Sequence, residues 1–373
     1  MLIIQKLKLN FKLIRELDFI LIFFVMILSV FGLMNIYSVT NRKNGYYFFN
    51  HQMIWILISI FIVYIILCID YSKFICYIDF AYWFNVVLLV YTYFFTSPIN
   101  GAKVWIQLGS VAVEPGEFCK LTITLMLAKK IQEMNGEINN FKNLCTLFIY
   151  SIIPTILILI APDLGLVLIV FFTVLSILFI CKLDLKMMLS GLLALVVIVT
   201  VAWNFGLIKE YQKQRLTSFI SQDSDLSGTN LQVSQSKIAI GSGGLMGQGF
   251  NKSTYIQGDF IPESHTDFIF AVVGSEWGLS GTVALLAVYA IVMVRIIKIG
   301  KNSKDISGTV VCVGSFGALV FSILQNIGMT VGIMPITGIT LPFISYGGSS
   351  ALCNFVAIGL ILNVGMRRKK INF

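Results

Sequence analysis

Long apolar segments, separated by short polar connectors, recur along almost the whole chain. A transmembrane helix needs about 17–25 predominantly apolar residues. Hydrophobic residues make up 57% of the chain and charged residues only 12%, whereas soluble domains carry about 25% charge. The sequence therefore predicts an all-α polytopic membrane helix bundle that forms a single domain over residues 1–373. The ten predicted spans are approximately 18–38, 53–69, 74–95, 115–132, 143–160, 164–181, 186–203, 267–296, 308–333 and 343–365.

Basic residues are distributed unequally between alternate connectors. If the N-terminus is inside, the inner connectors and both tails hold most of the Lys and Arg residues, and the short outer loops hold only Arg42, Lys43 and Lys103. The positive-inside rule then predicts that both termini are cytoplasmic and that the long loop between spans 7 and 8, residues 204–266, is extracytoplasmic. The net charge of +9 is explained by orientation in the cytoplasmic (inner) membrane and attraction to anionic lipid. No nucleic-acid partner is predicted.

Cysteine and histidine usage limits the chemistry that the chain can carry. The seven cysteines are scattered singly and no C-x-x-C is present, so neither a disulfide framework nor a zinc site is indicated. His51 and His265 are the only histidines, which excludes a metal cluster built from histidines.

Asp267 lies at the boundary between the long polar loop and the eighth apolar segment. A carboxylate at the edge of a bilayer is costly unless it is hydrated or paired, which makes Asp267 a candidate functional residue. The alternative is a residue that starts a helix, with Thr266 as the N-cap. Position alone does not decide between them.

A second polar group begins the fourth predicted span. Glu114, Glu117 and Lys120 are spaced three apart and share one helix face. Glu117 precedes Lys120, which is the favourable direction for an ion pair. The pair either reaches water at the outer end of the helix or, as we favour, lines a hydrated cavity inside the bundle.

Two further carboxylates lie near or within predicted spans. Asp163 follows Pro162 at the start of the sixth span, where a capping role is the simplest interpretation. Glu276 follows Asp267 by nine residues, or about 13 Å along a helix. An unpaired charge at that depth is disfavoured, so we predict that it pairs with Lys120.

Three outer connectors have unusual compositions. Residues 101–113 contain Trp105 among alternating apolar residues and are predicted to lie in the membrane interface. Residues 335–350 are uncharged and interrupted by Gly and Pro, which predicts a non-helical, re-entrant segment. Residues 241–249 are rich in glycine but lack G-K-[ST], so a tight turn or a close backbone approach is expected rather than a P-loop. Arg215, with Lys209 and Lys213, forms a basic cluster that either binds a diphosphate or is simply solvated.

Three stretches together resemble the SEDS family (shape, elongation, division and sporulation). They are Phe343 to Ser350, Pro262 to Phe270 and Ile238 to Phe250. Gly328 to Pro335 makes the chain similar to the RodA (elongation) type rather than the FtsW (division) type. The resemblance implies a ten-span bundle that polymerises lipid II into glycan strands at the outer face of the cytoplasmic membrane during cell elongation.

The resemblance also assigns roles to individual residues. The essential aspartate of the family's H-T-D-F motif corresponds to Asp267, and the glutamate and lysine of Q-P-S-E-x-x-K correspond to Glu117 and Lys120. In this chain that motif begins Glu114-Pro115-Gly116, the usual acidic pair after H-T-D-F is Ser275-Glu276, and Q-P-D-L-G has become Ala161-Pro-Asp-Leu-Gly. His265 and Ser349, inside the matching motifs, are predicted to bind substrate together with Arg215, Lys120 and Glu117.

The implied mechanism needs one base and one source of positive charge. Asp267 is expected to take the proton of a sugar 4-hydroxyl as that hydroxyl attacks the anomeric carbon of a second lipid II. Arg215, Lys120 or a divalent cation (Mg or Mn) would stabilise the diphosphate that leaves. The expected partners are lipid II, undecaprenyl diphosphate, a class B penicillin-binding transpeptidase and other membrane proteins of the elongation complex.

Three alternative functions stay open from the sequence. They are a flippase or transporter of a lipid-linked cell-wall precursor, a division-type FtsW paralogue, and a non-catalytic membrane scaffold. A transporter is expected to carry broken helices and charges on both sides of the midplane. Here the unusual polar segments gather at the outer face, which favours chemistry at that surface.

Overall fold

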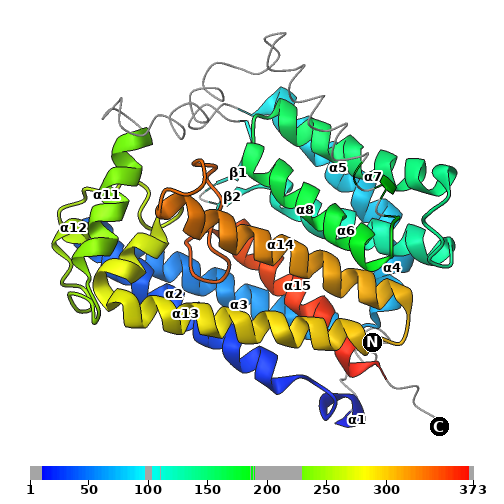
Figure 1. Cartoon of the computed structure of the whole chain (residues 1–373), viewed down its shortest axis with the longest axis horizontal. Helices are drawn as coiled ribbons and strands as arrows, with labels where there is room; N and C mark the ends of the chain where they lie inside the picture. The colour runs from blue at the N-terminus through cyan, green and yellow to red at the C-terminus, as the bar shows by residue number, and fades with distance from the viewer. Residues whose placement is uncertain are drawn as a thin grey trace.

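The structure, a computed structural model, describes residues 11–96, 103–109, 111–184, 186, 187, 189 and 229–368. Within these residues it consists of helices and one small hairpin (Figure 1). The elements are α1 (Phe11–Ile14), α2 (Phe19–Asn44), α3 (Tyr47–Cys68), α4 (Tyr71–Cys76), α5 (Ile78–Phe95), β1 (Ile106–Leu108), β2 (Val111–Val113), α6 (Pro115–Glu133), α7 (Phe141–Ile160), α8 (Leu164–Ile180), α11 (Thr229–Ser242), α12 (Thr254–Gln257), α13 (Ile269–Lys301), α14 (Ile306–Thr330) and α15 (Gly348–Met366).

The predicted all-α membrane bundle is confirmed. Seven of the described helices, namely α2, α3, α5, α7, α13, α14 and α15, are long and apolar enough to cross a bilayer, and α8 is a shorter apolar helix. The fourth predicted span is present as α6, which is not one of the seven and carries Glu117 and Lys120 within its length. Nearly all of the seventh predicted span, residues 186–203, lies outside the described residues.

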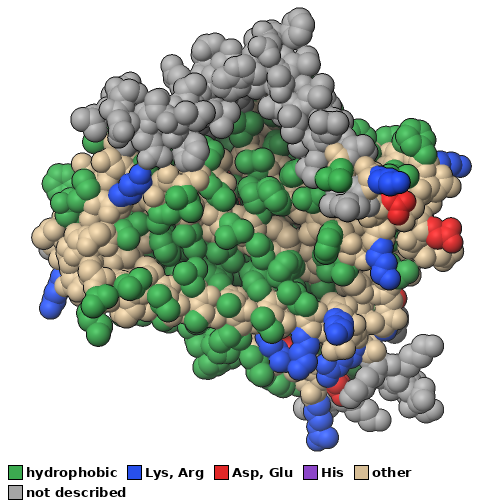
Figure 2. Space-filling view, viewed as in Figure 1, with side chains coloured by type: hydrophobic (Ala, Val, Ile, Leu, Met, Phe, Trp, Pro, Cys, Tyr) green, Lys and Arg blue, Asp and Glu red, His purple; other side chains and the backbone are tan. Residues whose placement is uncertain are grey.

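Helices α14 and α15 form the centre of the bundle. The most apolar windows of α14 and α15 are 72% and 83% buried, whereas those of the other five long helices are 22–39% buried. Helix α15 packs against α3, and α14 packs against α6, α8 and α13. The outer helices therefore present apolar side chains outward, and such side chains cover much of the face in Figure 2.

The two ends of the described chain lie together. Helix α1 and the C-terminal end of α15 lie at the same end of the bundle (Figure 1), where Arg368 pairs with Glu16 at 3.1 Å. Lys and Arg side chains also gather at this end (Figure 2). This arrangement agrees with an even number of spans.

The glycine-rich stretch 241–249 docks onto a break in α13. Gly278 has φ 65° and ψ −161°, values outside the helical region. A Cβ at Gly247, where φ is 82°, would overlap the carbonyl oxygen of Glu276. The predicted close backbone approach is thus confirmed. Four backbone hydrogen bonds replace those lost at the break: Gln248 N–H to Ser275 O (3.0 Å), Gly249 N–H to Glu276 O (3.0 Å), Leu279 N–H to Gly244 O (2.9 Å) and Ser280 N–H to Leu245 O (3.0 Å).

The segment between α14 and α15, residues 331–347, is non-helical, and residues 341–345 within it are buried. The prediction of a non-helical stretch over residues 335–350 is confirmed up to residue 347, since α15 begins at Gly348. Leu341, Phe343 and Ile344 are at most 5% exposed. Its buried backbone is satisfied by side chains: Asn326 donates to Ile339 O at 2.7 Å. A buried carbonyl of this non-helical backbone therefore keeps a hydrogen-bond partner.

Part of the connector predicted to lie in the interface forms a hairpin. Strands β1 and β2 pair antiparallel with Ile106 opposite Val113. Alternating apolar residues suit a strand, because successive side chains of a strand point to opposite faces. The hairpin leads directly into α6, so it fixes where that helix and its polar residues begin.

Candidate functional site

Asp267 lies just before α13 and does not cap it. The N-cap is Phe268, and no side chain makes a cap hydrogen bond there. Thr266 as the N-cap is therefore wrong. Its hydroxyl instead lies 3.2 Å from Glu263 O. The alternative interpretation of Asp267 as a helix-start residue loses its main support.

The backbone of Asp267 is fixed from two sides, while its side chain is only partly buried. Its N–H donates to Glu263 O at 3.1 Å, and its carbonyl accepts a hydrogen bond from Asn326 Nδ2 at 2.8 Å. The carboxylate lies against segment 331–347, because a Cβ at Gly338 would be 3.4 Å from Asp267 Oδ2. A glycine at that position leaves space beside the carboxylate.

The two family-like motifs that surround Asp267 hold each other. Tyr346 N–H donates to His265 O at 2.9 Å, and Ser345 Oγ donates to Thr266 O at 2.6 Å. The imidazole of His265 packs in an aromatic cluster, 4.8 Å from the Phe48 ring and 5.7 Å from the Tyr346 ring. Burial lowers the pKa of His265. Its ring is therefore placed to orient the loop, and its predicted contact with substrate stays a prediction.

Glu117 and Lys120 form a buried ion pair. Their side chains are 10% and 7% exposed, and Lys120 Nζ lies 2.5 Å from Glu117 Oε2. The alternative in which the pair reaches water at the helix end is wrong, because the packing of α14 and α15 against α6 covers this face. Lys120 also lies 3.5 Å from Asn354 Oδ1 of α15.

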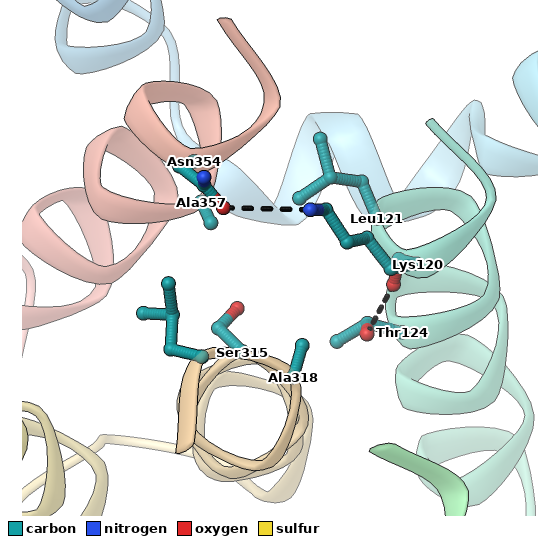
Figure 3. A pocket seen from close by; sticks show the side chains of 8 residues that line it. Lys120, Leu121, Thr124, Ser315, Ala318, Asn354 and Ala357 are labelled. Atoms are coloured by element: carbon teal, nitrogen blue, oxygen red, sulfur yellow. Dashed lines mark hydrogen bonds between the residues drawn. The ribbon is translucent and has the colours of Figure 1, made fainter. Parts of the chain in front are cut away.

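Beside the ammonium of Lys120 is a cavity of about 10 Å³ (Figure 3). That volume is close to the minimum that holds one water molecule. The polar residues that line it are Lys120, Thr124, Ser315 and Asn354. Of the three residues predicted to line a hydrated cavity, Lys120 alone lines this one, and its hydration stays a prediction.

The predicted pairing of Glu276 with Lys120 is wrong. Lys120 pairs with Glu117 of its own helix. Glu276 is 1% exposed, and its Oε1 accepts a hydrogen bond from Ser38 of α2. The reason is the orientation of α13 about its axis. Helix α13 packs against α2, and the face that carries Glu276 is directed at α2 and away from Lys120.

Sequence reasoning missed a carboxyl pair formed by Glu114 and Asp163. Asp163 caps α8 as predicted, since Leu166 N–H donates to its Oδ1 at 3.0 Å. The same carboxyl group also hydrogen-bonds the Glu114 side chain. Burial, and then the neighbouring carboxyl charges, hold the pKa of Glu114 well above its usual value. Burial is also the main reason that the pKa of Asp163 rises to about 6.

A signal for this pair was present in the sequence. Both residues flank a proline at the start of a predicted span, Glu114 before Pro115 and Asp163 after Pro162. Ser349 joins the same region, because its Oγ accepts the Glu114 N–H at 3.0 Å. It thereby ties the start of α15 to the start of α6.

Two predicted sources of positive charge are not located. Arg215, with Lys209 and Lys213, lies outside the described residues. In the described part of the chain, no three His, Cys, Asp or Glu side chains are grouped so that they could hold a metal ion. Lys120 is therefore the predicted cation that the structure does place.

Comparisons with known proteins agree with this architecture. The family model of FtsW, RodA and SpoVE, described as cell cycle protein, matches residues 15–370. The peptidoglycan glycosyltransferase MrdB of Escherichia coli (strain K12) is 35% identical over 289 residues, 77% of each chain. The probable peptidoglycan glycosyltransferase FtsW of Wigglesworthia glossinidia brevipalpis is 32% identical over 363 residues, 92% of each chain.

Two solved structures have the same fold. A chain from the work "Structural coordination of polymerization and crosslinking by a peptidoglycan synthase complex" superposes with a TM-score of 0.81 and 27% identity, covering 94% of this chain and 98% of that one. The rod shape determining protein RodA of Thermus thermophilus superposes with a TM-score of 0.72 and 25% identity, covering 95% and 98%.

Proposed function

The chain belongs to the SEDS family of FtsW, RodA and SpoVE proteins and is a peptidoglycan glycosyltransferase of the RodA, elongation type, and from this premise we propose how its residues carry the reaction. Asp267 is the general base. It takes the proton of the 4-hydroxyl of one lipid II as that oxygen attacks the anomeric carbon of another. The bond from the anomeric carbon to the diphosphate breaks, and undecaprenyl diphosphate leaves.

The single observation that supports Asp267 most is the way its backbone is held while its carboxylate stays partly exposed. Asn326 and Glu263 fix its backbone through hydrogen bonds of 2.8 and 3.1 Å. The side chain is only partly buried, and Gly338 leaves room beside it. A positioned carboxylate with room for a hydroxyl is what general base catalysis requires, and such a base contributes about 10²–10⁴-fold.

One carboxylate is sufficient for this displacement. A diphosphate leaves without protonation, so the reaction does not need the second carboxyl group that glycoside hydrolases use. It does need positive charge near the leaving oxygen. We propose that Lys120 contributes that charge together with Arg215. His265 and Ser349 stay predicted substrate contacts.

A divalent cation such as Mg²⁺ or Mn²⁺ also stays a proposal. Magnesium is commonly held by one or two carboxylates together with substrate phosphates. In the described part of the chain, Glu114 and Asp163 are a pair of carboxyl groups that face each other, but they hydrogen-bond each other directly. As they stand, they do not fit a metal ion, and no step here depends on one.

We propose a class B penicillin-binding transpeptidase as the partner, together with other membrane proteins of the elongation complex. The support is the solved structure with a TM-score of 0.81, which comes from a peptidoglycan synthase complex that coordinates polymerisation and crosslinking. We also propose that both termini face the cytoplasm. The Lys and Arg side chains gathered where α1 and the end of α15 meet support that orientation.

The test is the purified full-length variant Asp267→Asn, assayed on lipid II with the transpeptidase added. We expect no glycan polymer, because the amide cannot accept the hydroxyl proton. The melting temperature should be unchanged, because asparagine has nearly the same size and shape as aspartate. Glu263→Gln is the matched control: it neutralises an exposed carboxylate four residues earlier, keeps the Glu263 carbonyl that accepts the Asp267 N–H, and should polymerise normally. Polymer formation by Asp267→Asn at the wild-type rate would remove the base assignment.

A further inference from the structure

Lys120 is held by side chains from two helices. An ammonium group has three N–H donors. Glu117 of α6 lies 2.5 Å from it and Asn354 of α15 lies 3.5 Å from it. Figure 3 shows the Lys120 side chain extending from α6 toward Asn354, with Ser315 of α14 on another side of the cavity. Without Asn354 the flexible lysine side chain would be directed by Glu117 alone.

Asn354 connects Lys120 to a further residue. Its Oδ1 faces the ammonium, while its Nδ2 donates to Ser350 Oγ at 3.4 Å. Ser350 Oγ in turn lies 2.8 Å from Thr340 Oγ1. An amide accepts at one end and donates at the other, so asparagine suits both neighbours at once. An aspartate at position 354 would keep the contact with Lys120 but could not donate to Ser350. A leucine would lose both contacts.

Thr340 belongs to segment 331–347, which contacts the proposed base. Gly338, two residues earlier, lies against Asp267 Oδ2. The carbonyl of Ile339, which lies between Gly338 and Thr340, accepts a hydrogen bond from Asn326 Nδ2 at 2.7 Å. The same Asn326 side chain also donates to Asp267 O at 2.8 Å. Polar contacts thus run from the buried ion pair to Thr340, and the backbone of residues 338–340 connects them to the hydrogen bonds that hold Asp267.

We propose that Asn354 is a positioning residue for glycosyl transfer. Through Ser350 and Thr340 it fixes segment 331–347 beside Asp267, and through its carbonyl it fixes the direction of the Lys120 ammonium. The cation and the base are thereby held in one arrangement. This inference rests on the proposed roles of Asp267 and Lys120, and it assigns Asn354 no contact with substrate.

The test measures initial rates of lipid II polymerisation by full-length variants over a range of lipid II concentrations. Asn354→Leu should lower kcat by about 10- to 100-fold with little change in KM, because misplacement of reacting groups by about 1 Å costs up to 10²-fold. Asn354→Asp should lose less, since it keeps the contact with Lys120. The matched control is Asn35→Leu, another buried asparagine, which accepts the Trp277 indole N–H at 3.2 Å. It should lower the melting temperature and leave kcat unchanged.

A double-mutant cycle with Thr340→Val separates positioning from loss of stability. If the contacts act as one unit, Asn354→Leu combined with Thr340→Val should be little slower than the slower single variant. The inference would be overturned if the fold losses in kcat of the two single variants multiplied in the double variant. It would also be overturned if a folded Asn354→Leu kept the wild-type kcat. If Asn354→Leu does not fold, Asn354→Asp takes its place in the same cycle. An active Asp267→Asn would instead overturn the proposed base, so the two failures are distinguishable.

Discussion

Two buried carboxylates, Glu117 in α6 and Glu276 in α13, are accommodated in opposite ways. Glu117 has a cation one helical turn away, and Lys120 lies at 2.5 Å. Glu276 is 1% exposed and accepts hydrogen bonds from the Ser38 hydroxyl and from the backbone N–H of Asn251, and no described cation pairs with it. The two glutamates are similarly buried, so burial alone does not tell which of them carries function.

The surroundings of the two glutamates explain the difference. Glu117 pairs with Lys120 of α6, and Lys120 in turn contacts Asn354 of α15, from which polar contacts lead toward the segment beside Asp267. Around Glu276 they are mainly backbone contacts, because the glycine-rich stretch 241–249 fills the break in α13. The α6 region is therefore organised around a charge, and the α13 region around a close backbone approach. Each region should respond to a different kind of substitution.

The largest effect should follow removal of the cation. Lys120→Ala leaves Glu117 buried without a counter-charge, and breaking one partner of a buried pair costs about 3–5 kcal/mol. We expect a strong loss of folded protein, measured as yield of monodisperse protein in detergent. Any folded fraction should polymerise lipid II poorly, since a cation for the diphosphate is missing.

The double variant Lys120→Ala with Glu117→Gln separates the two roles of Lys120. Removing both charges should restore folding, because no uncompensated charge stays buried. Polymerisation should stay low. Normal yield of the single variant would contradict the buried pair, and normal activity of the double variant would remove Lys120 from catalysis.

The backbone of the α13 region should be the next most sensitive. Gly247→Ala places a Cβ against the carbonyl oxygen of Glu276 at a residue with φ of 82°. We expect a loss of about 1–3 kcal/mol, the usual cost of holding a residue in such a conformation. Thermal unfolding in detergent measures it.

Gly241→Ala is the control for this experiment, because a Cβ there would meet nothing within 4 Å. It should be neutral or slightly stabilising, since Gly241 lies inside α11. Equal melting temperatures for the two variants would show that the close approach at Gly247 is not rigid.

The sequence predicts these regions to different depths. Span positions are predictable because length and apolar content decide them, and the glycine-rich stretch was predictable because only glycine permits such close contact. The side chains that a buried polar residue contacts were not predictable from the sequence. Spacing places Glu276 at a depth but does not say that its face is directed at α2. Asp163 likewise met the local criteria for a cap, and its contact with Glu114 depends on α6 lying beside α8.

The missed carboxyl pair predicts a dependence of stability on pH. Burial raises the pKa of Asp163 from 3.8 to about 6, and that of Glu114 also rises. A carboxyl group whose pKa is raised on folding favours the folded state at low pH, and that stabilisation is lost as the pH rises through the folded-state value. The melting temperature should therefore fall between pH 5 and pH 7, by about a few degrees. Glu114→Gln should flatten this dependence, and an equally steep profile in that variant would contradict the pair.

The smallest effect should come from neutralising Glu276. The substitution Glu276→Gln keeps the size of the side chain and an acceptor for the Ser38 hydroxyl. No ion pair is lost, since none of the described Lys or Arg side chains forms one with Glu276. We expect a change below about 1 kcal/mol in stability, the usual scale for one hydrogen bond, and normal polymerisation of lipid II. Glu117→Gln, the same chemical change at the other buried glutamate, should cost more, because it leaves Lys120 charged and buried. If Glu276→Gln were as damaging as Glu117→Gln, the α13 region would also depend on a charge, and the distinction between the two regions would fail.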